Sequence, residues 1–273
     1  AALERRLDDP RLRICKGDVR DYDRLQEVMD GVNIVVHAAA LKRVDGESDA
    51  SEMELTNVDG SRNVARAAVE RRVERVMGIS SDKACQAVTL YGATKLVMER
   101  HFLSAHGSSR TAFGCVRYGN VIGSAGSIVP LFREQARTGR ITVTDLRCTR
   151  FWLGLDDAVR WVKRRVELLE PGSLYVPILP SVRVVDVAEA IAPRAKVEVI
   201  GMRGIEKTHE QMVSFDESRC ARRVDDPDTL DHFVIGPRPT ERREFTYSRE
   251  QAQRFLTVDE IARSLPAETL VAA

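Results

Sequence analysis

Short apolar runs alternate with amphipathic stretches along the first half of the chain. Residues 32–40 (VNIVVHAAA) and 73–81 (VERVMGISS) are apolar runs of strand length, typical of strands buried on both faces of a sheet. Residues 57–72 and 91–105 mix apolar and polar positions at helical spacing and predict two helices. Strands and helices that alternate in this way predict βαβ units and a parallel sheet.

Three other stretches continue this pattern. Residues 11–18 predict a short strand, and residues 22–32 predict a helix that Gly31 is placed to end. Residues 111–123 predict a strand that runs into a Gly-rich loop. Right-handed crossovers would join these units into a doubly wound parallel sheet, an α/β fold that binds its ligands at the carboxyl ends of the strands.

The pattern of predicted strands and helices changes after Gly123. Residues 170–192 contain Pro-punctuated strand segments and one helix, residues 196–212 add a strand and a charged loop, and a polar surface tail ends in a short helix. We therefore expect a large sheet-containing domain over residues 1–170 and a smaller C-terminal lobe over residues 171–273 that closes over the sheet.

Composition narrows the range of partners and compartments. The 42 Lys and Arg residues nearly balance the 41 Asp and Glu residues, so neither nucleic acid nor an anionic membrane is expected as the main partner. The five cysteines are odd in number and form no C-x-x-C pair, and the five histidines are scattered. We expect no disulfide framework, no metal site and a reducing cytoplasm. No apolar run approaches the ~20 residues of a membrane span, and no signal peptide is visible.

A motif common to dinucleotide-binding folds is missing from the sequence. Such folds normally open with a strand, a G-x-G-x-x-G turn and a helix whose N-terminus holds the pyrophosphate. Gly119, Gly123 and Gly126 come too late in the chain and do not open a helix after a first strand. The expected sheet is therefore Rossmann-like but lacks its first βα unit.

Tyr91 and Lys95 form the first candidate catalytic pair. Their i, i+4 spacing puts both side chains on one face of a helix. An ammonium near a phenol lowers the pKa of the phenol from about 10 toward neutrality, which would let Tyr91 take a proton from a sugar hydroxyl as hydride leaves the same carbon. Chance spacing on a surface helix is the alternative. The pair follows a buried strand with Ser80 to Lys83 at its tip, and this position favours a catalytic role.

Asp82 and Lys83 offer a second acid and base, and Asp82 lies nine residues before Tyr91. An exposed ion pair at a strand end is the usual form of such a dipeptide and would contribute little. At a strand tip that faces a cofactor the same pair can transfer protons.

Other stretches carry binding candidates. Asp18 can accept a hydrogen bond from an adenine amine, and the small residues 38–40 let backbone approach a dinucleotide. Solvated charge and ordinary helix–sheet packing are the alternatives. Arg203 follows a strand directly and can hold a nucleotide diphosphate, with Glu206 in the same charged loop. A solvated loop is the alternative there.

Taken together, these motifs resemble extended short-chain dehydrogenases/reductases that act on nucleotide sugars. More specifically, the motifs resemble the inverting UDP-N-acetylglucosamine 4,6-dehydratases of bacterial flagellin glycosylation and capsule synthesis. It covers nearly the whole chain and includes VVHAAALKRV, TNVDGSRNV, SSDKACQAVTLYGATK, VRYGNVIGSAGSIVPLF and GMRGIEKTHE. The Asp–Lys pair is its most specific element, because related retaining dehydratases carry Asp–Glu there and 4-epimerases carry only Ser or Thr with Tyr and Lys. The resemblance also implies an upstream Gly-rich unit and a chain truncated at its N-terminus.

The resemblance implies a cofactor, a substrate and roles for particular residues. NAD or NADP would be tightly bound by residues 1–170 and recycled, a UDP-sugar would bind the lobe of residues 171–273, and a homo-oligomer would form through the helix that carries Tyr91. The catalytic positions would be Asp82, Lys83, Tyr91 and Lys95. Tyr91 and Lys95 would serve oxidation at C4, and elimination of water would use Lys83 as a neutral base and Asp82 as a protonated acid. Burial would raise the pKa of Asp82 and lower the pKa of Lys83, as these roles require. The cofactor-binding positions would be Asp18, Val19, Ala38, Ala39, Ala40, Asn57, Ser80, Tyr91, Lys95 and Tyr118. The substrate-binding positions would be Lys42, Asn120, Arg203 and Glu206.

Two other kinds of function stay open on the sequence. A UDP-sugar 4-epimerase or a retaining 4,6-dehydratase would share the Tyr/Lys pair, and the course of the C5 proton in deuterated water separates these enzymes. A non-catalytic sugar-nucleotide-binding remnant would account for the missing phosphate loop, and a cofactor-binding titration separates it from an enzyme.

Overall fold

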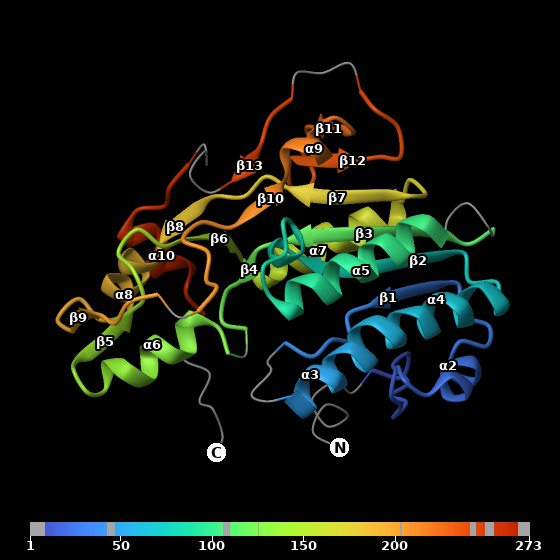
Figure 1. Ribbon diagram of the computed structural model, residues 1–273, viewed down its shortest axis with the longest axis horizontal. Coiled ribbons are helices and arrows are strands. Elements are labelled where there is room, and N and C mark those ends of the chain that lie inside the picture. The colour runs from blue at the N-terminus through green and yellow to red at the C-terminus, as the bar shows by residue number, and fades with distance from the viewer. Residues whose placement is uncertain are drawn as a thin grey trace.

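A six-stranded sheet forms the centre of the computed structural model, which describes residues 9–42, 47–105, 110–124, 126–202, 204–240, 244–248 and 254–266 (Figure 1). The strand order is β1-β2-β3-β7-β12-β11. The strands are β1 (Ile34–His37), β2 (Arg75–Ser81), β3 (Ala112–Tyr118), β7 (Ser173–Pro177), β12 (His232–Ile235) and β11 (Ala221–Val224). The first four are parallel, and β12 and β11 pair antiparallel at the far edge. The predicted α/β fold with a mostly parallel sheet is confirmed.

Helices cover both faces of this sheet, because successive strand residues point to opposite sides. On one face, Val76 of β2 packs in a cluster with residues of α4 (Gly60–Glu70) and α5 (Leu90–Ala105). On the other face, Met77 packs with Trp161 of α7 (Leu155–Glu167). Figure 1 shows α4 and α5 in front of the sheet and α7 largely behind it. The apolar strands at 73–81 and 111–123 and both helices therefore lie as the sequence predicts.

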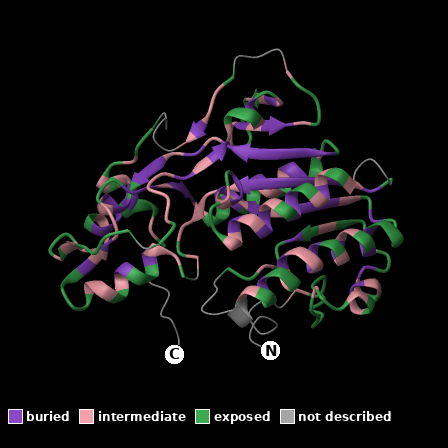
Figure 2. Cartoon of the chain, in the orientation of Figure 1, coloured by how far each residue is buried: buried purple, intermediate pink, exposed green. Residues whose placement is uncertain are grey.

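The edge strand β1 differs from the prediction of burial on both faces. Ile34 and Val36 are 44% and 47% exposed, whereas the central strands are largely buried in Figure 2. Val36 pairs with Met77 in register, so Ile34 and Val36 point to the face of the sheet that α7 covers at β2. In the described residues, the apolar cluster under α7 includes Met77 but neither Ile34 nor Val36 of the edge strand. The strand predicted over residues 11–18 is also wrong. This segment is irregular and exposed, because the described part of the chain offers no neighbouring strand to pair its N–H and C=O groups.

The helix predicted over 22–32 is confirmed as α2 (Tyr22–Val28). Asp21 caps it by accepting a hydrogen bond from the backbone N–H of Arg24 at 3.0 Å. Gly31 follows with a φ of 72°, a left-handed conformation that favours glycine and ends the helical path. The remaining early elements are α3 (Glu47–Glu54), the π-helical turn η1 (Leu55–Asp59) and the 3₁₀ turn η2 (Asp82–Ala84).

A smaller lobe lies beside the sheet and has its own core. Its small sheets are β4 (Asn120–Val121) with β6 (Thr149–Leu153) and β8 (Ser181–Arg183), and β5 (Arg140–Val143) with β9 (Lys196–Val199). Its helices are α6 (Ile128–Ala136), α8 (Val184–Ile191) and α10 (Val258–Ser264). Phe132, Ile141, Trp152, Val187 and Ile261 are buried together in its core. No helix in the described part of the chain is long and apolar enough to cross a membrane.

The chain passes more than once between the main sheet and this lobe. Residues 120–153 supply lobe strands before β7 returns to the main sheet, and β11 and β12 return again after β9. Near the junction, β10 (Gln211–Val213) pairs with β13 (Tyr247–Ser248), and α9 (Phe215–Ser218) follows β10. The division at residue 170 stays a prediction about folding units, and the interleaved elements favour a lobe built from three stretches.

Candidate active site

The candidate site begins where β2 ends. The Ser81 side chain accepts a hydrogen bond from the backbone N–H of Lys83 at 3.3 Å, which starts the single turn η2. Short hydroxyl side chains favour such local bonds over a continued strand. The turn buries the Asp82 side chain to 1% exposure and leaves Lys83 half-buried at the carboxyl edge of the sheet.

Gly92 lets α5 pack directly against this turn. A Cβ atom at Gly92 would lie 2.2 Å from the carbonyl oxygen of Lys83, so any other residue would push the two apart. This close approach puts Tyr91 and Lys95, one turn apart on α5, around the same space as Lys83.

A cavity of about 520 Å³ lies over the carboxyl ends of β2 and β3. The four predicted catalytic residues line it together: Asp82, Lys83, Tyr91 and Lys95. Several predicted binding residues also line it: Ala38, Ala40, Lys42, Ser80, Tyr118 and Asn120. The Asp82–Lys83 pair therefore shares a cavity with Tyr91 and is not an isolated surface ion pair.

A second cavity of about 390 Å³ adjoins the first. Lys83, Thr89 and Asn120 line both cavities, so Lys83 lies at their junction. The predicted substrate residue Glu206 lines the second cavity. Arg203 lies outside the described residues, and its role stays a prediction.

Four predicted cofactor residues line neither cavity: Asp18, Val19, Ala39 and Asn57. Asp18 lies on the surface, where its carboxylate accepts hydrogen bonds from Arg20 at 2.7–3.0 Å. Asn57 is buried and fixes the backbone of Leu41, accepting from its N–H at 2.7 Å and donating to its carbonyl at 2.9 Å. Asn57 thereby positions the loop that leads to Lys42, and the predicted contacts of these four residues with a cofactor stay predictions.

The Asp82–Lys83 pair is charged, contrary to the sequence-based expectation. Lys83 Nζ donates to Asp82 Oδ1 at 3.1 Å. Burial by itself would raise the pKa of Asp82 and lower the pKa of Lys83. The attraction between the two groups outweighs burial, so the pKa of Asp82 lies below its ordinary value and the pKa of Lys83 lies above. Burial therefore acts on both residues in the expected direction, but it does not make the pair neutral, because each charge compensates the desolvation of the other.

The pKa of Tyr91 also differs from the expectation. Burial is the largest influence and raises it, and the positive charge of Lys83 only partly offsets this. Lys95 is 3% exposed, its Nζ donates to the sulfur of Met98 at 3.6 Å, and burial lowers its pKa to about 8. The expected lowering of the Tyr91 pKa by Lys95 is therefore wrong in this structure. Lys83 is the cation that acts on Tyr91.

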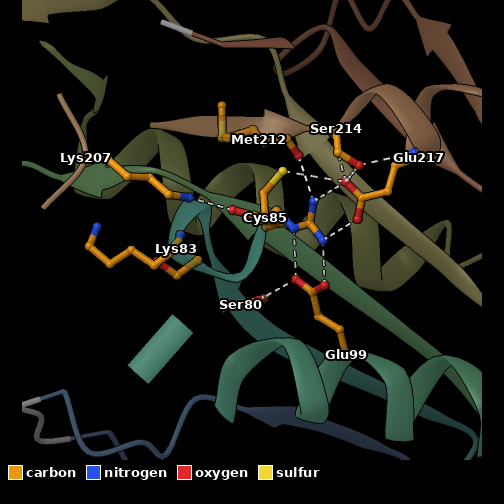
Figure 3. A network of polar contacts seen from close by, with 10 residues as sticks. Ser80, Lys83, Cys85, Glu99, Lys207, Met212, Ser214 and Glu217 are labelled. Carbon is orange, nitrogen blue, oxygen red and sulfur yellow. Dashed lines mark hydrogen bonds and ion pairs between the residues drawn. The ribbon is translucent and has the colours of Figure 1, made fainter. Parts of the chain in front are cut away.

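Arg117 of β3 joins the catalytic helix to the segment around β10. Its guanidinium is fully buried and donates to Glu99 of α5 at 2.6 and 2.9 Å and to Glu217 of α9 at 2.8 and 2.9 Å (Figure 3). It also donates to the carbonyl of Met212 at 2.8 Å. These bonds use all five N–H donors of the guanidinium, so the buried charge is fully satisfied. The network fixes β10 and α9 relative to the helix that carries Tyr91.

Sequence reasoning missed Arg117 and Glu210. Glu210 is 5% exposed, and its Oε1 lies 3.6 Å from Lys83 Nζ. Both residues fall inside the quoted motifs VRYGNVIG and GMRGIEKTHE, but neither has a local signal of its role. Their partners are far away along the chain, and only the folded arrangement brings them together.

Several known proteins resemble this chain in sequence or in fold. Residues 2–230 match the family model described as polysaccharide biosynthesis protein. The chain is 43% identical over 234 residues to the UDP-N-acetylglucosamine 4,6-dehydratase (inverting) of Campylobacter jejuni subsp. jejuni serotype O:2, covering 84% of this chain and 69% of that protein. It is 34% identical to the UDP-glucose 4-epimerase of Rickettsia rickettsii, covering 89% and 72%. The X-ray structure of Pen from Bacillus thuringiensis is similar with a TM-score of 0.86 and 33% identity, covering 96% and 84%.

Proposed function

This chain belongs to the polysaccharide biosynthesis protein family, and from that premise we propose that it is a UDP-N-acetylglucosamine 4,6-dehydratase that inverts the configuration at C5. The observation that carries the proposal is the cavity shared by Asp82, Lys83, Tyr91 and Lys95. Oxidation at C4 needs only a Tyr/Lys pair, whereas elimination of water also needs a neighbouring acid and base. The product would be a UDP-4-keto-6-deoxy-hexosamine for bacterial glycan, flagellin or capsule synthesis.

The cavity suits the nicotinamide end of NAD or NADP. Lys95 is buried, and the acceptor on its ammonium is the sulfur of Met98, which is a weak acceptor. The ammonium can therefore still donate to ribose hydroxyls. Ala38 and Ala40 line the same cavity with small side chains that leave room for a planar ring. NAD(P) bound there supplies a hydride acceptor that is regenerated within one turnover.

The chain's own residues carry the proton transfers. Tyr91 takes the proton of the sugar 4-hydroxyl, and the positive charge of Lys83 favours the phenolate that this step needs. Transfer of one proton from Lys83 Nζ to Asp82 Oδ1, across 3.1 Å, converts the ion pair into an amine and a carboxylic acid. This transfer needs no outside proton, because the neutral pair and the ion pair hold the same number of protons.

The neutral pair then has the two groups that elimination requires. The Lys83 amine removes the C5 proton, which the new 4-ketone has made acidic. The Asp82 carboxylic acid gives its proton to the leaving 6-hydroxyl, and water departs. Lys83 ends as an ammonium and Asp82 as a carboxylate, so the original ion pair returns. C6 would then receive the hydride that C4 gave up, and inversion requires that C5 receives its new proton on the opposite face of the ring.

Turnover of UDP-N-acetylglucosamine with NAD⁺ tests the proposal. We expect mass spectrometry to show a product that has lost one water, and we expect NMR to show a C6 methyl group. A UDP-sugar product of unchanged mass would favour a 4-epimerase. The similarity to the Rickettsia rickettsii UDP-glucose 4-epimerase is the observation that supports this second candidate. No turnover together with no binding of NAD⁺ or NADP⁺ in a titration would favour a non-catalytic sugar-nucleotide-binding protein.

We also propose that the chain forms a homo-oligomer through α5 in a reducing cytoplasm. Val97 of α5 and Leu55 of η1 are 36% and 46% exposed, and a shallow hollow lies between these elements. All five cysteines are outside disulfides, which suits a reducing compartment. Light scattering of the wild type and of Val97→Glu tests the interface, and an unchanged mass in the variant contradicts it.

A further inference from the structure

Glu210 places a second carboxylate beside Lys83. Its Oε1 lies 3.6 Å from Lys83 Nζ, and Asp82 Oδ1 lies 3.1 Å from the same nitrogen. The other oxygens of the two carboxylates, Glu210 Oε2 and Asp82 Oδ2, are buried and have no hydrogen-bond partner among the described residues. One ammonium at the junction of two cavities thus faces two carboxylates, and each carboxylate keeps an acceptor oxygen for a ligand.

The fold fixes Glu210 independently of Lys83. On one side, Nδ1 of the adjacent His209 is hydrogen-bonded to Oγ1 of Thr149 at 2.8 Å. On the other side, the carbonyl of Met212 accepts from Arg117 at 2.8 Å (Figure 3). The backbone is therefore held on both sides of Glu210, and the side chain is buried beside Lys83.

The cations near Lys83 are held by other partners. Arg150 of β6 pairs with Glu206 at 3.3 Å, and Lys207 donates to the carbonyl of Cys85 at 2.8 Å. Tyr91 of α5 also faces Lys83, and Lys42 and Lys95 line the same cavity.

The surroundings of Lys83 have opposing effects on its pKa. Burial and Arg150 lower the pKa of Lys83, whereas Asp82 and then Glu210 raise it, and the carboxylates prevail.

We propose that Glu210 is a positioning residue for Lys83, which holds its ammonium at the junction of the two cavities and biases the Asp82–Lys83 pair toward its charged form. The inference rests on the proposed function for its catalytic meaning. A sugar hydroxyl that donates to Glu210 Oε2 disperses the negative charge and favours transfer of the proton from Lys83 to Asp82. The base then forms in response to substrate.

Chemical labelling of Lys83 tests this without substrate. The half-buried ammonium is accessible to acetic anhydride, which acylates only the neutral amine, and peptide mass spectrometry reads the extent of reaction. Loss of an opposite charge at this distance lowers the pKa of a lysine by about one unit or more. We therefore expect Lys83 of Glu210→Gln to be labelled about tenfold faster than in the wild type at pH 9. Glu210→Asp, which keeps the charge, should label at close to the wild-type rate.

Glu198→Gln is the matched control, because Glu198 lies on β9 of the smaller lobe and pairs with Arg140. Its Lys83 should label at close to the wild-type rate. Equal labelling in Glu210→Gln and the wild type overturns the proposal, as does faster labelling of equal size in Glu198→Gln. If Glu210→Gln is too unstable to purify, a Glu210→Asp variant whose Lys83 labels as fast as the side-chain amine of free lysine overturns it instead.

The pH profile of dehydration gives the catalytic readout. Removing the negative charge lowers the pKa values of the coupled pair, so both limbs of the profile in Glu210→Gln should move to lower pH. A loss of turnover with an unshifted profile indicates a merely structural residue and overturns the proposal. Absence of dehydration in the wild type instead refutes the proposed function, and the labelling result then still decides the role of Glu210.

Discussion

Glu217→Gln tests how strongly the buried ion network stabilises the fold. Burial by itself would raise the pKa of Glu217, but the hydrogen bonds and charge of Arg117 outweigh it and lower the pKa from 4.5 to about 2. A folded-state pKa below the unfolded value means that the ionised carboxylate stabilises the fold above pH 4.5. That stability is lost as the pH falls toward 2. The shift corresponds to about 3 kcal/mol at pH 7, at about 1.4 kcal/mol per pKa unit.

Urea unfolding of the wild type and Glu217→Gln at several pH values measures this contribution. We expect the variant to be less stable by about 3 kcal/mol at pH 7, and the difference to shrink by about 1.4 kcal/mol for each pH unit below 4.5. Glu260→Gln is the matched control, because Glu260 forms a capping box on α10 as Glu217 does on α9, but it is half-buried and pairs with Arg254 instead of Arg117. A pH-independent difference, or an equal effect in the control, would refute the reasoning.

Two further substitutions address the site itself. Lys83→Met should lower the rates of dehydration and of C5 proton exchange by about 10²-fold or more. Oxidation at C4 should remain, and the absorbance of the reduced cofactor measures it. Dehydration at a near wild-type rate would show that Lys83 is not the base. Gly92→Ala should destabilise the chain by about 1–3 kcal/mol and reduce turnover, because its Cβ would meet the Lys83 carbonyl at 2.2 Å. Gly236→Ala, where a Cβ meets nothing within 4 Å, is the control in the same thermal and activity assays, and equal behaviour of the two would contradict the packing argument.

The parts of the fold that the sequence predicted are those with a local cause. Apolar runs predicted β2 and β3, helical spacing predicted α5, and Gly31 marked the end of α2. The chemistry-bearing residues at the tip of β2 followed from the same pattern, because parallel sheets bring strand ends and helix starts to one edge. The shared location of Lys83 and Tyr91 in one cavity could therefore be predicted from the sequence.

The failures have causes that lie outside any local window. Ile34 and Val36 look like core residues, and their exposure depends on whether other elements cover that face of the edge strand β1. The directions in which the pKa values of Asp82 and Lys83 shift depend on the balance between burial and a partner charge. The sequence gives neither the depth of burial nor the distance between the two charged groups. Glu210 reaches Lys83 only through the Arg117 network and the fold of the smaller lobe.

The fate of the C5 hydrogen during turnover in deuterated water tests the central claim most directly. If Asp82 and Lys83 expel water beside the Tyr91 pair, NMR of the product should show deuterium at C5, inverted configuration at that carbon and a methyl group at C6. A product that keeps hydrogen at C5 and its 6-hydroxyl would contradict the account, and deuterium at C5 with unchanged configuration would contradict the inversion.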